Sequence, residues 1–174
     1  MSIHWEIERK FLVAGSALPK ANGVQHILQG YLTCEGPASV RVRMCDGVAR
    51  LTIKDRASPP GQARAEFEYD VPLDHAHYLL TQVCPRPPLE KRRHNVTFAG
   101  FEWIIDEFMG ENKGLILAEI ELGKRNDAFP VPFWVGMEVT SDPRYHNSYL
   151  YQHPYCEWRW PGSHIQPVEA VACR

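Results

Sequence analysis

Hydrophobic and polar residues alternate with a period of two through most of the first 123 residues. Successive side chains of a strand point to opposite faces, so this alternation predicts strands with one apolar and one polar face. We expect eight of them, at residues 3–13, 26–34, 38–46, 48–55, 63–72, 88–98, 101–108 and 114–123. Short links such as Asp46-Gly47 and Ala99-Gly100 have the composition of tight turns, which predicts antiparallel neighbours.

Helical patterns are fewer. An apolar stripe behind the Asp74 cap predicts a helix over about 73–84, and Ser141-Asp142-Pro143 opens a second one at about 142–151. A shorter turn is expected at 131–137, and a polar, proline-rich stretch at 58–62 is typical of a hairpin tip. Residues 152–174 mix prolines with aromatic residues, so we expect an irregular extension that packs back on the domain and frays beyond about 165.

The segment at residues 6–10 (Glu-Ile-Glu-Arg-Lys) places Glu6, Glu8 and Lys10 on one strand face. Two residues of strand rise separate the two carboxylates by about 7 Å, where they repel each other unless a positive charge lies between them. A divalent cation is the simplest such charge. The alternative is a charged strand edge that faces solvent, and this segment alone does not decide between the two.

Charges of one sign cluster on one face of each predicted strand. The resulting sheet face carries six bases and seven acids: Lys10, Arg41, Arg43, Lys54, Lys91 and Arg93, with Glu6, Glu8, Glu66, Glu68, Asp106, Glu119 and Glu121. A solvated face also alternates, but it mixes signs because like charges side by side are unfavourable. The sign blocks therefore favour two ligand zones, carboxylates for a hard divalent cation and basic groups for phosphate oxygens. Ile104 interrupts the pattern of its strand, and Arg92 falls on the opposite face.

A metal-chelated polyphosphate needs both zones, since Mg²⁺ is held by a few carboxylates together with phosphate oxygens of the substrate. The chain has no glycine-rich phosphate loop of the P-loop or dinucleotide-binding type. Side chains must therefore hold the phosphates. Periodicity does not tell whether the charged face is the inside of a closed barrel or the outside of an ordinary one.

Length and composition limit the remaining classes of protein. A chain of 174 residues, 44% hydrophobic and 23% charged, fits one globular domain, and a net charge of -2 argues against a general nucleic-acid-binding surface. The five cysteines are an odd number without a Cys-x-x-Cys pair, which is typical of reduced thiols. Neither a signal sequence nor a membrane-spanning run is recognisable, so we expect a cytoplasmic protein without a membrane partner.

The N-terminal segment resembles the Glu-x-Glu-x-Lys signature of the CYTH superfamily, the triphosphate tunnel metalloenzymes. Seven further blocks resemble the family in the same order, at residues 29–32, 40–43, 51–54, 66–69, 90–93, 105–108 and 118–122, so the likeness covers about residues 3–150. The resemblance implies an α+β, mainly β fold: a closed eight-stranded antiparallel β-barrel with the charged face lining a tunnel and helices packed outside. Residues 1–151 would form this domain and residues 152–174 an extension on it.

The resemblance also implies roles for the charged residues. The divalent metal, Mg²⁺ or Mn²⁺, would be bound by Glu6, Glu8, Glu119, Glu121 and Asp106, with Glu66 and Glu68 as additional acids around it. The triphosphate would be bound by Lys10, Arg41, Arg43, Lys54, Lys91 and Arg93. Lys10 and Lys91 would flank the scissile end, and together with Glu6 and Glu8 they are the expected catalytic residues.

The implied reaction is the metal-dependent hydrolysis of a triphosphate. The chain is most similar to short bacterial members that convert inorganic tripolyphosphate to pyrophosphate and phosphate. A thiamine triphosphatase or a class IV adenylate cyclase is the alternative among enzymes, and a non-catalytic polyphosphate-binding module is the alternative of another class. Tyr31 is equally compatible with the tunnel and with the core. The aromatics of the extension either close one end of the tunnel or cover the barrel exterior, and we expect the second. Nucleic acid is not an expected partner, and a homodimer is left open.

Overall fold

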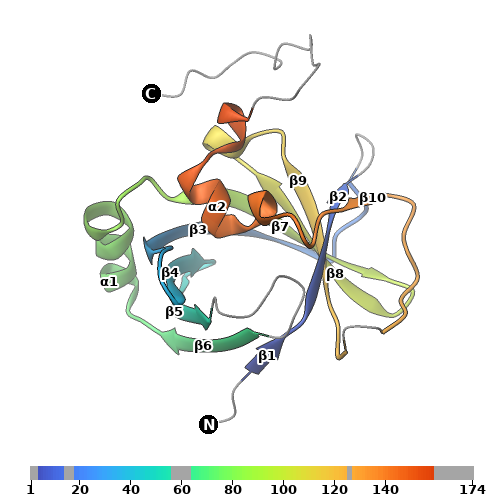
Figure 1. The fold of residues 1–174 in the computed structure, drawn as a ribbon, viewed down its shortest axis with the longest axis horizontal. Helices are drawn as coiled ribbons and strands as arrows, with labels where there is room; N and C mark the ends of the chain where they lie inside the picture. Colours follow the sequence, from blue (N-terminus) through green and yellow to red (C-terminus); the bar gives the residue numbers. More distant parts are fainter. Residues whose placement is uncertain (1–3, 14–17, 56–63, 125–126, 159–174) are drawn as a thin grey trace.

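The computed structural model describes residues 4–13, 18–55, 64–124 and 127–158. These residues form ten strands: β1 (His4–Glu6), β2 (Glu8–Val13), β3 (Gly23–Thr33), β4 (Ala38–Cys45), β5 (Val48–Asp55), β6 (Arg64–Asp70), β7 (Leu89–Phe98), β8 (Phe101–Phe108), β9 (Ile116–Glu121) and β10 (Val135–Glu138). The hydrogen-bonded order is β1-β6-β5-β4-β3-β7-β8-β9-β2-β10, and every neighbouring pair is antiparallel. Figure 1 shows the strands curving around a common centre.

All eight predicted strand segments are confirmed, but the count of eight is wrong. The first segment is divided at Ile7 into β1 and β2, and residues 135–138, expected within a turn, form β10 on the edge of β2. That strand is only four residues long and is set by its pairing with β2, so its own sequence pattern does not reveal it. The predicted hairpin tip at 58–62 lies outside the described residues.

The Asp46-Gly47 link is the tight hairpin turn that its sequence predicts. Both residues have positive φ, 47° and 81°, which is the requirement of a two-residue turn between twisted antiparallel strands. The turn fixes the register in which β4 and β5 pair, Cys45 opposite Val48 and Arg41 opposite Thr52.

The N-terminal segment contacts both ends of the remaining sheet. Among the described residues the hydrogen-bonded order is open, with β1 at one end and β10 at the other. However, β1 pairs with β6 while β2 pairs with β9, and only Ile7 separates β1 from β2 in the chain. The amide of Leu122 donates to the Ile7 carbonyl at 2.8 Å, which extends the β2–β9 contact to this residue.

The predicted helix over 73–84 is confirmed and lies on the outside of the sheet. It begins as α1 (Leu73–Tyr78) and continues as a π-helical turn, η1 (Leu79–Val83). Ala76 and Leu80 are buried against Val42 and Ala49, on the sheet face opposite the charged one. No described helix is both long and apolar enough to cross a membrane.

The second predicted helix is present but packs on the other side of the sheet. The segment forms a 3-10 turn, η3 (Pro143–Tyr145), the helix α2 (Asn147–Gln152) and a further turn, η4 (Tyr155–Glu157), while η2 (Gly110–Asn112) links β8 to β9. Tyr31 lies opposite Arg41, and Phe108 lies opposite Lys91. Directly paired residues share a face, so these apolar side chains stand on the charged face, and they pack with Leu150 of α2.

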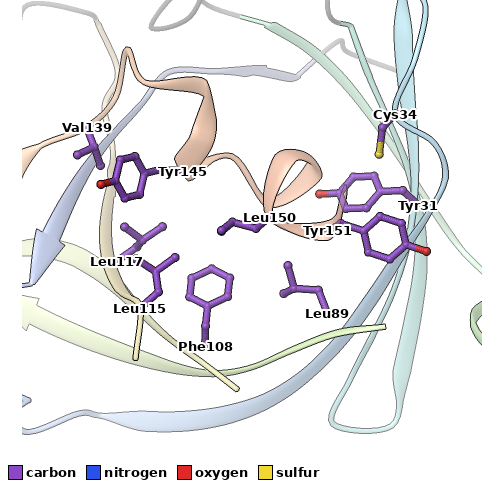
Figure 2. Close-up of a cluster of buried hydrophobic side chains, with 10 residues drawn as sticks. All are labelled: Tyr31, Cys34, Leu89, Phe108, Leu115, Leu117, Val139, Tyr145, Leu150 and Tyr151. Carbon is purple, nitrogen blue, oxygen red and sulfur yellow. The ribbon is translucent and has the colours of Figure 1, made fainter. Parts of the chain in front are cut away.

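The cluster around α2 closes one end of the sheet interior. Its buried members are Tyr31, Cys34, Leu89, Phe108, Leu115, Leu117, Val139, Tyr145, Leu150 and Tyr151. Figure 2 shows Leu150 near the centre of these side chains, with strand residues on one side and α2 above them. The expectation that all helices pack outside is therefore wrong for α2. The inward residues at this end of the strands are apolar, and burying them requires a cover. Tyr155 and Trp158 also pack against this cluster, so these two aromatics belong to the cover of the interior and not to the barrel exterior, where they were expected. The remainder of the extension, residues 159–174, lies outside the described residues.

Gly30 marks a close approach between β3 and the end of η1. A Cβ at this position would lie 2.9 Å from Cys84 Sγ and 2.9 Å from Leu80 Cδ2. We expect Gly30→Ala to lower the free energy of unfolding by about 1–3 kcal/mol, because overpacking displaces the side chains of Leu80 and Cys84. Urea unfolding measures the change. Gly23→Ala on the same strand is the control: nothing lies within 4 Å of its Cβ, and a change above about 0.5 kcal/mol there would contradict the packing explanation.

Candidate active site

A cavity of about 610 Å³ opens on the charged face of the sheet. Nine of the predicted site residues line it, from six strands: Glu8, Arg41, Arg43, Lys54, Glu66, Glu68, Arg93, Glu119 and Glu121. The backbone of Glu6 pairs with Arg64, and its side chain lies outside the described part of the chain. The strand alternation therefore gathers most of the predicted residues at one cavity.

The strand register places some acids opposite other acids and some bases opposite acids. Glu8 is the cross-strand partner of Glu121, and two residues further along Lys10 is the partner of Glu119. Lys54 is likewise opposite Glu66. Cross-strand partners on one face lie about 4.5–5.5 Å apart at Cβ, close enough for direct ion pairs.

Lys10 is buried beneath the cavity surface and is held by two carboxylates. Its ammonium donates to Glu119 Oε1 and lies 3.6 Å from Glu8 Oε1. Burial alone would lower the pKa of Lys10, but Glu119 and Glu8 outweigh it, and the pKa is raised above its ordinary value. The side chain is 3% exposed and does not line the cavity, so Lys10 is a charged, ion-paired group in this arrangement.

Asp106 is the shared counter-charge of Lys91 and Arg93. Arg93 makes a bidentate contact, with Nε and Nη2 each 2.8 Å from an Asp106 oxygen, and Lys91 donates to the same carboxylate. Burial would raise the pKa of Asp106, but the two cations hold it well below its ordinary range. Both Asp106 and Lys91 are fully buried and do not line the cavity. Asp106 therefore acts as the counter-charge of Lys91 and Arg93 in this arrangement.

Lys91 differs from Lys10 because its neighbourhood is less negative. Burial is the largest effect and lowers the pKa of Lys91 to about 8, with Asp106 opposing this and Arg93 reinforcing it. Its ammonium also lies 3.4 Å from the side-chain oxygen of Asn147, the first residue of α2. Asn147 lines the cavity, so it connects Lys91 to the site.

A second ion-pair network joins β4, β5 and β6. Glu66 lies 3.0 Å from Lys54 and 3.7 Å from Arg41, and Glu68 lies 3.2 Å from Arg43. Within it, Nε of Arg41 is buried and makes no hydrogen bond with any described residue. A buried donor without a partner is costly, so the guanidinium of Arg41 is not fully satisfied by its contacts with Thr52, Glu66 and Glu68.

The carboxylates suit a hard divalent cation by type. Glu8, Glu119 and Glu121 all line the cavity, and oxygen donors are the ligands of Mg²⁺ and Mn²⁺. In the described residues no three acidic, histidine or cysteine side chains converge as a ligand set. Lys10 contacts only Oε1 of Glu119, and Oε2 lies 3.7 Å from Arg93 Nη2, so this carboxylate keeps acceptor capacity for a cation.

Five cavity residues are absent from the predicted set: Phe67, Tyr69, Glu102, Ile104 and Asn147. Glu102 has the same strand parity as Asp106, so the alternation contains the signal for it. Ile104, which interrupts the charge pattern of its strand, also lines the cavity. Asn147 belongs to a helix from a distant part of the chain, and strand parity carries no information about it.

Tyr31 belongs to the apolar cluster. It is 5% exposed, its ring centroid lies 5.3 Å from that of Tyr151, and it does not line the cavity. Burial raises the pKa of Tyr31 to about 12. Its hydroxyl accepts a long hydrogen bond from Gln29 at 3.4 Å.

The fold and the site together define a mainly β protein whose interior presents separate acidic and basic zones to one cavity. The CYTH domain profile matches residues 4–146. The chain belongs to the CYTH domain family.

Two curated relatives are inorganic triphosphatases. The one from Acetivibrio thermocellus is 46% identical over 151 residues, covering 86% of this chain and 95% of the relative. The one from Nitrosomonas europaea is 34% identical over 149 residues, covering 83% and 95%.

Solved structures agree at the level of the fold. A crystal structure of an inorganic triphosphatase aligns with a TM-score of 0.63 at 31% identity, covering 84% of this chain and 93% of that one. A Hippeastrum protein with a dominant triphosphatase activity aligns with a TM-score of 0.56, covering 68% and 80%. Its identity is 14%, so it shares the fold alone.

Replacing Asp106 tests the dependence of the two buried cations on one carboxylate. We expect Asp106→Asn to lower the free energy of unfolding by about 3–5 kcal/mol, because it leaves two buried positive charges without a counter-charge. Chemical unfolding followed by tryptophan fluorescence gives the value. Glu102→Gln, on the same strand but exposed, should change it by less than about 0.5 kcal/mol. Equal losses in the two variants would contradict the assignment.

Proposed function

We propose that this protein hydrolyses inorganic triphosphate to pyrophosphate and phosphate with the help of a divalent cation, Mg²⁺ or Mn²⁺. The main support is the composition of the cavity wall. It has a basic zone, formed by Arg41, Arg43, Lys54 and Arg93, and a second zone of carboxylates. The basic zone would bind the phosphate chain, and the carboxylate zone would bind its metal ion. The curated relatives, both inorganic triphosphatases and both matched over 95% of their length, support the same reaction.

We further propose that the sheet works as a closed eight-stranded barrel. The N-terminal segment would act as one strand that pairs with β6 through its first part and with β9 through its second, with β10 as an addition on its edge. Closure would place the charged face inside, where water is limited. Residues 1–151 would form this domain, and the extension from residue 152 would belong to the same core through Tyr155 and Trp158.

Charge balance supports the need for a metal. Six acids and four bases line the cavity, and with Asp106, Lys10 and Lys91 beneath its surface the count is seven acids to six bases, an excess of one negative charge before any ligand enters. Triphosphate is itself a multiply charged anion, and its entry into such a site is unfavourable without accompanying positive charge. The proposed metal ligands are Glu6, Glu8, Glu119 and Glu121. When bound, the cation would neutralise phosphate oxygens and lower the pKa of a coordinated water.

The basic residues would supply the remaining electrostatic stabilisation. Arg41, Arg43 and Lys54 would bind phosphate oxygens along β4 and β5, and Arg93, fixed by its bidentate contact with Asp106, would present a rigid guanidinium from β7. Phosphoryl transfer is catalysed chiefly by positioning and charge stabilisation, so a water held in line with the scissile bond would complete the arrangement.

Lys10 and Lys91 are proposed to act at the closed end near α2. Lys91 reaches Asn147 on the cavity wall, and Lys10 holds the Glu119 carboxylate. Lys10 would orient the Glu119 carboxylate for the cation, and its ammonium would add positive charge close to the phosphate oxygens. Asp106 is better placed to keep Lys91 and Arg93 charged and oriented than to bind the metal directly, because both of its oxygens already accept from these cations.

An organic triphosphate is the second candidate substrate. Phe67 and Tyr69 line the cavity and are 40% and 50% exposed. Their cross-strand partners, Ile53 and Leu51, place both rings on the opposite face from Glu66 and Glu68. A thiamine triphosphatase or a class IV adenylate cyclase, which would need an aromatic platform for the organic ring, stays the alternative function.

A substrate panel separates these functions. With Mg²⁺ or Mn²⁺, we expect rapid phosphate release from tripolyphosphate, slow release from ATP and thiamine triphosphate, and none with excess chelator. Colorimetric phosphate assays and chromatography of nucleotide products provide the measurement. Faster turnover of an organic triphosphate would favour the second candidate. Tight binding of tripolyphosphate with no release under any metal would favour a non-catalytic polyphosphate-binding module.

Glu121→Gln tests the proposed carboxylate zone. We expect the turnover of tripolyphosphate to fall at least about a hundredfold at low Mg²⁺, because loss of one anionic ligand weakens metal binding. Part of the loss should be recovered as Mg²⁺ is raised. Arg92→Gln is the control, since Arg92 is exposed and has the opposite strand parity from Lys91 and Arg93. Unchanged metal dependence in folded Glu121→Gln would place the metal elsewhere.

A further inference from the structure

Glu68 is the centre of the ion-pair network on β4, β5 and β6. Its Oε1 lies 3.5 Å from Arg41 Nη2 and 3.2 Å from Arg43 Nη2, and its Oε2 lies 3.4 Å from Arg50 Nη1. One carboxylate therefore contacts three guanidinium groups. Two of these, Arg41 and Arg43, line the main cavity.

Thr52 fixes the position of this carboxylate. Thr52 and Glu68 are cross-strand partners, and the fully buried Thr52 hydroxyl donates to Glu68 Oε1 at 2.9 Å. The same hydroxyl accepts from Arg41 Nη2 at 3.0 Å. The register of β5 and β6 therefore fixes the contact between Thr52 and Glu68. The hydrogen bond from Thr52 and the nearby arginines lower the pKa of Glu68 despite its partial burial, so the group is a permanent anion at neutral pH.

The contacts of Glu68 are of a kind that a ligand can replace. Its side chain is 31% exposed, and each arginine reaches it through a single nitrogen at 3.2–3.5 Å. Asp106 contrasts with it, being fully buried with two 2.8 Å contacts from Arg93. Bidentate buried contacts persist, whereas single contacts at the edge of solvent exchange readily.

We propose that Glu68 is a specificity-determining residue that acts as an internal competitor of phosphate. In the free protein it occupies the guanidinium groups of Arg41 and Arg43, and an entering phosphate chain must displace it from them. This competition weakens every phosphate ligand that uses these arginines. A triphosphate with its metal has enough other contacts to overcome it, while pyrophosphate and phosphate do not and are released. The inference rests on the proposed function for the identity of the ligand.

Calorimetric titration with pyrophosphate in the presence of Mg²⁺ tests the proposal, because the proposed reaction does not consume this ligand. We expect Glu68→Gln to tighten the binding of pyrophosphate about tenfold, because the isosteric amide keeps the Thr52 contact and removes the competing charge. Pyrophosphate should become a correspondingly stronger competitive inhibitor of tripolyphosphate hydrolysis. Glu68→Ala should shift the affinity in the same direction, which separates the loss of charge from any new contact made by the amide.

Asp70→Asn is the matched control. Asp70 is on the same strand, its side chain is 79% exposed, and it contacts Arg50 at 3.1 Å without lining the cavity. Asp70→Asn removes one negative charge beside Arg50, and the affinity for pyrophosphate should change by less than about twofold. Equal tightening in Asp70→Asn would show a general charge effect and overturn the proposal. Unchanged or weaker pyrophosphate binding in both folded Glu68 variants would also overturn it.

The outcome is independent of the catalytic assay. If the wild-type protein binds pyrophosphate but releases no phosphate from tripolyphosphate with any metal, the proposed function fails while the titrations still decide the role of Glu68. If hydrolysis occurs and the variants bind pyrophosphate no more tightly than the wild type, the proposed function stands and the competitor role fails.

Discussion

Charged side chains on the inner face of a curved sheet are tolerated only when each has a counter-charge within reach, and strand register supplies these partners. Lys10 stands opposite Glu119, Lys54 opposite Glu66 and Arg93 opposite Asp106. The buried carboxylate of Asp106 is the counter-charge of two cations, Lys91 and Arg93, so more buried charge depends on it than on any of the other acids named here. The rest of the site depends on this pairing, because a shift of register by one residue would turn every one of these groups to the opposite face.

The two ends of the interior have different physical characters. Toward α2 the inward side chains become apolar, and Leu150 and Tyr145 bury them. Away from α2 the inward side chains are charged and line the cavity. Asn147 stands at the boundary, as the first residue of α2 and a contact of Lys91. The helix therefore both stabilises the core and delimits the closed end of the site.

In the free protein, acids and bases of the cavity satisfy one another. Glu119 pairs with Lys10, and Glu68 pairs with Arg41 and Arg43. A metal-bound triphosphate offers both kinds of group a new partner, cation for the acids and anion for the bases. Binding would then exchange internal ion pairs for external ones, and the difference between the two sets would determine affinity. Among the buried side-chain atoms of the described cavity residues, Nε of Arg41 is the one without a hydrogen-bond partner.

Most of the sheet and most of the site follow from alternation along the chain. The strand segments, the Asp46-Gly47 turn and the shared face of Glu8, Arg41 and Lys54 are all local consequences of a period of two, which the sequence displays directly. The division of the first strand at Ile7 and the short strand β10 are not, because both depend on which neighbours are paired.

Which residues share the charged face can be read from the chain, since side-chain direction in a strand is a local property. How deeply each of them lies depends on the packing of the whole fold. Lys10, Lys91 and Asp106 have the same parity as the cavity residues, yet they are buried beneath its surface because neighbouring strands and α2 cover them. That packing also brings Asn147 to the site from outside the strands. Burial and long-range contact depend on how distant segments pack together, and no pattern within a single segment encodes that arrangement.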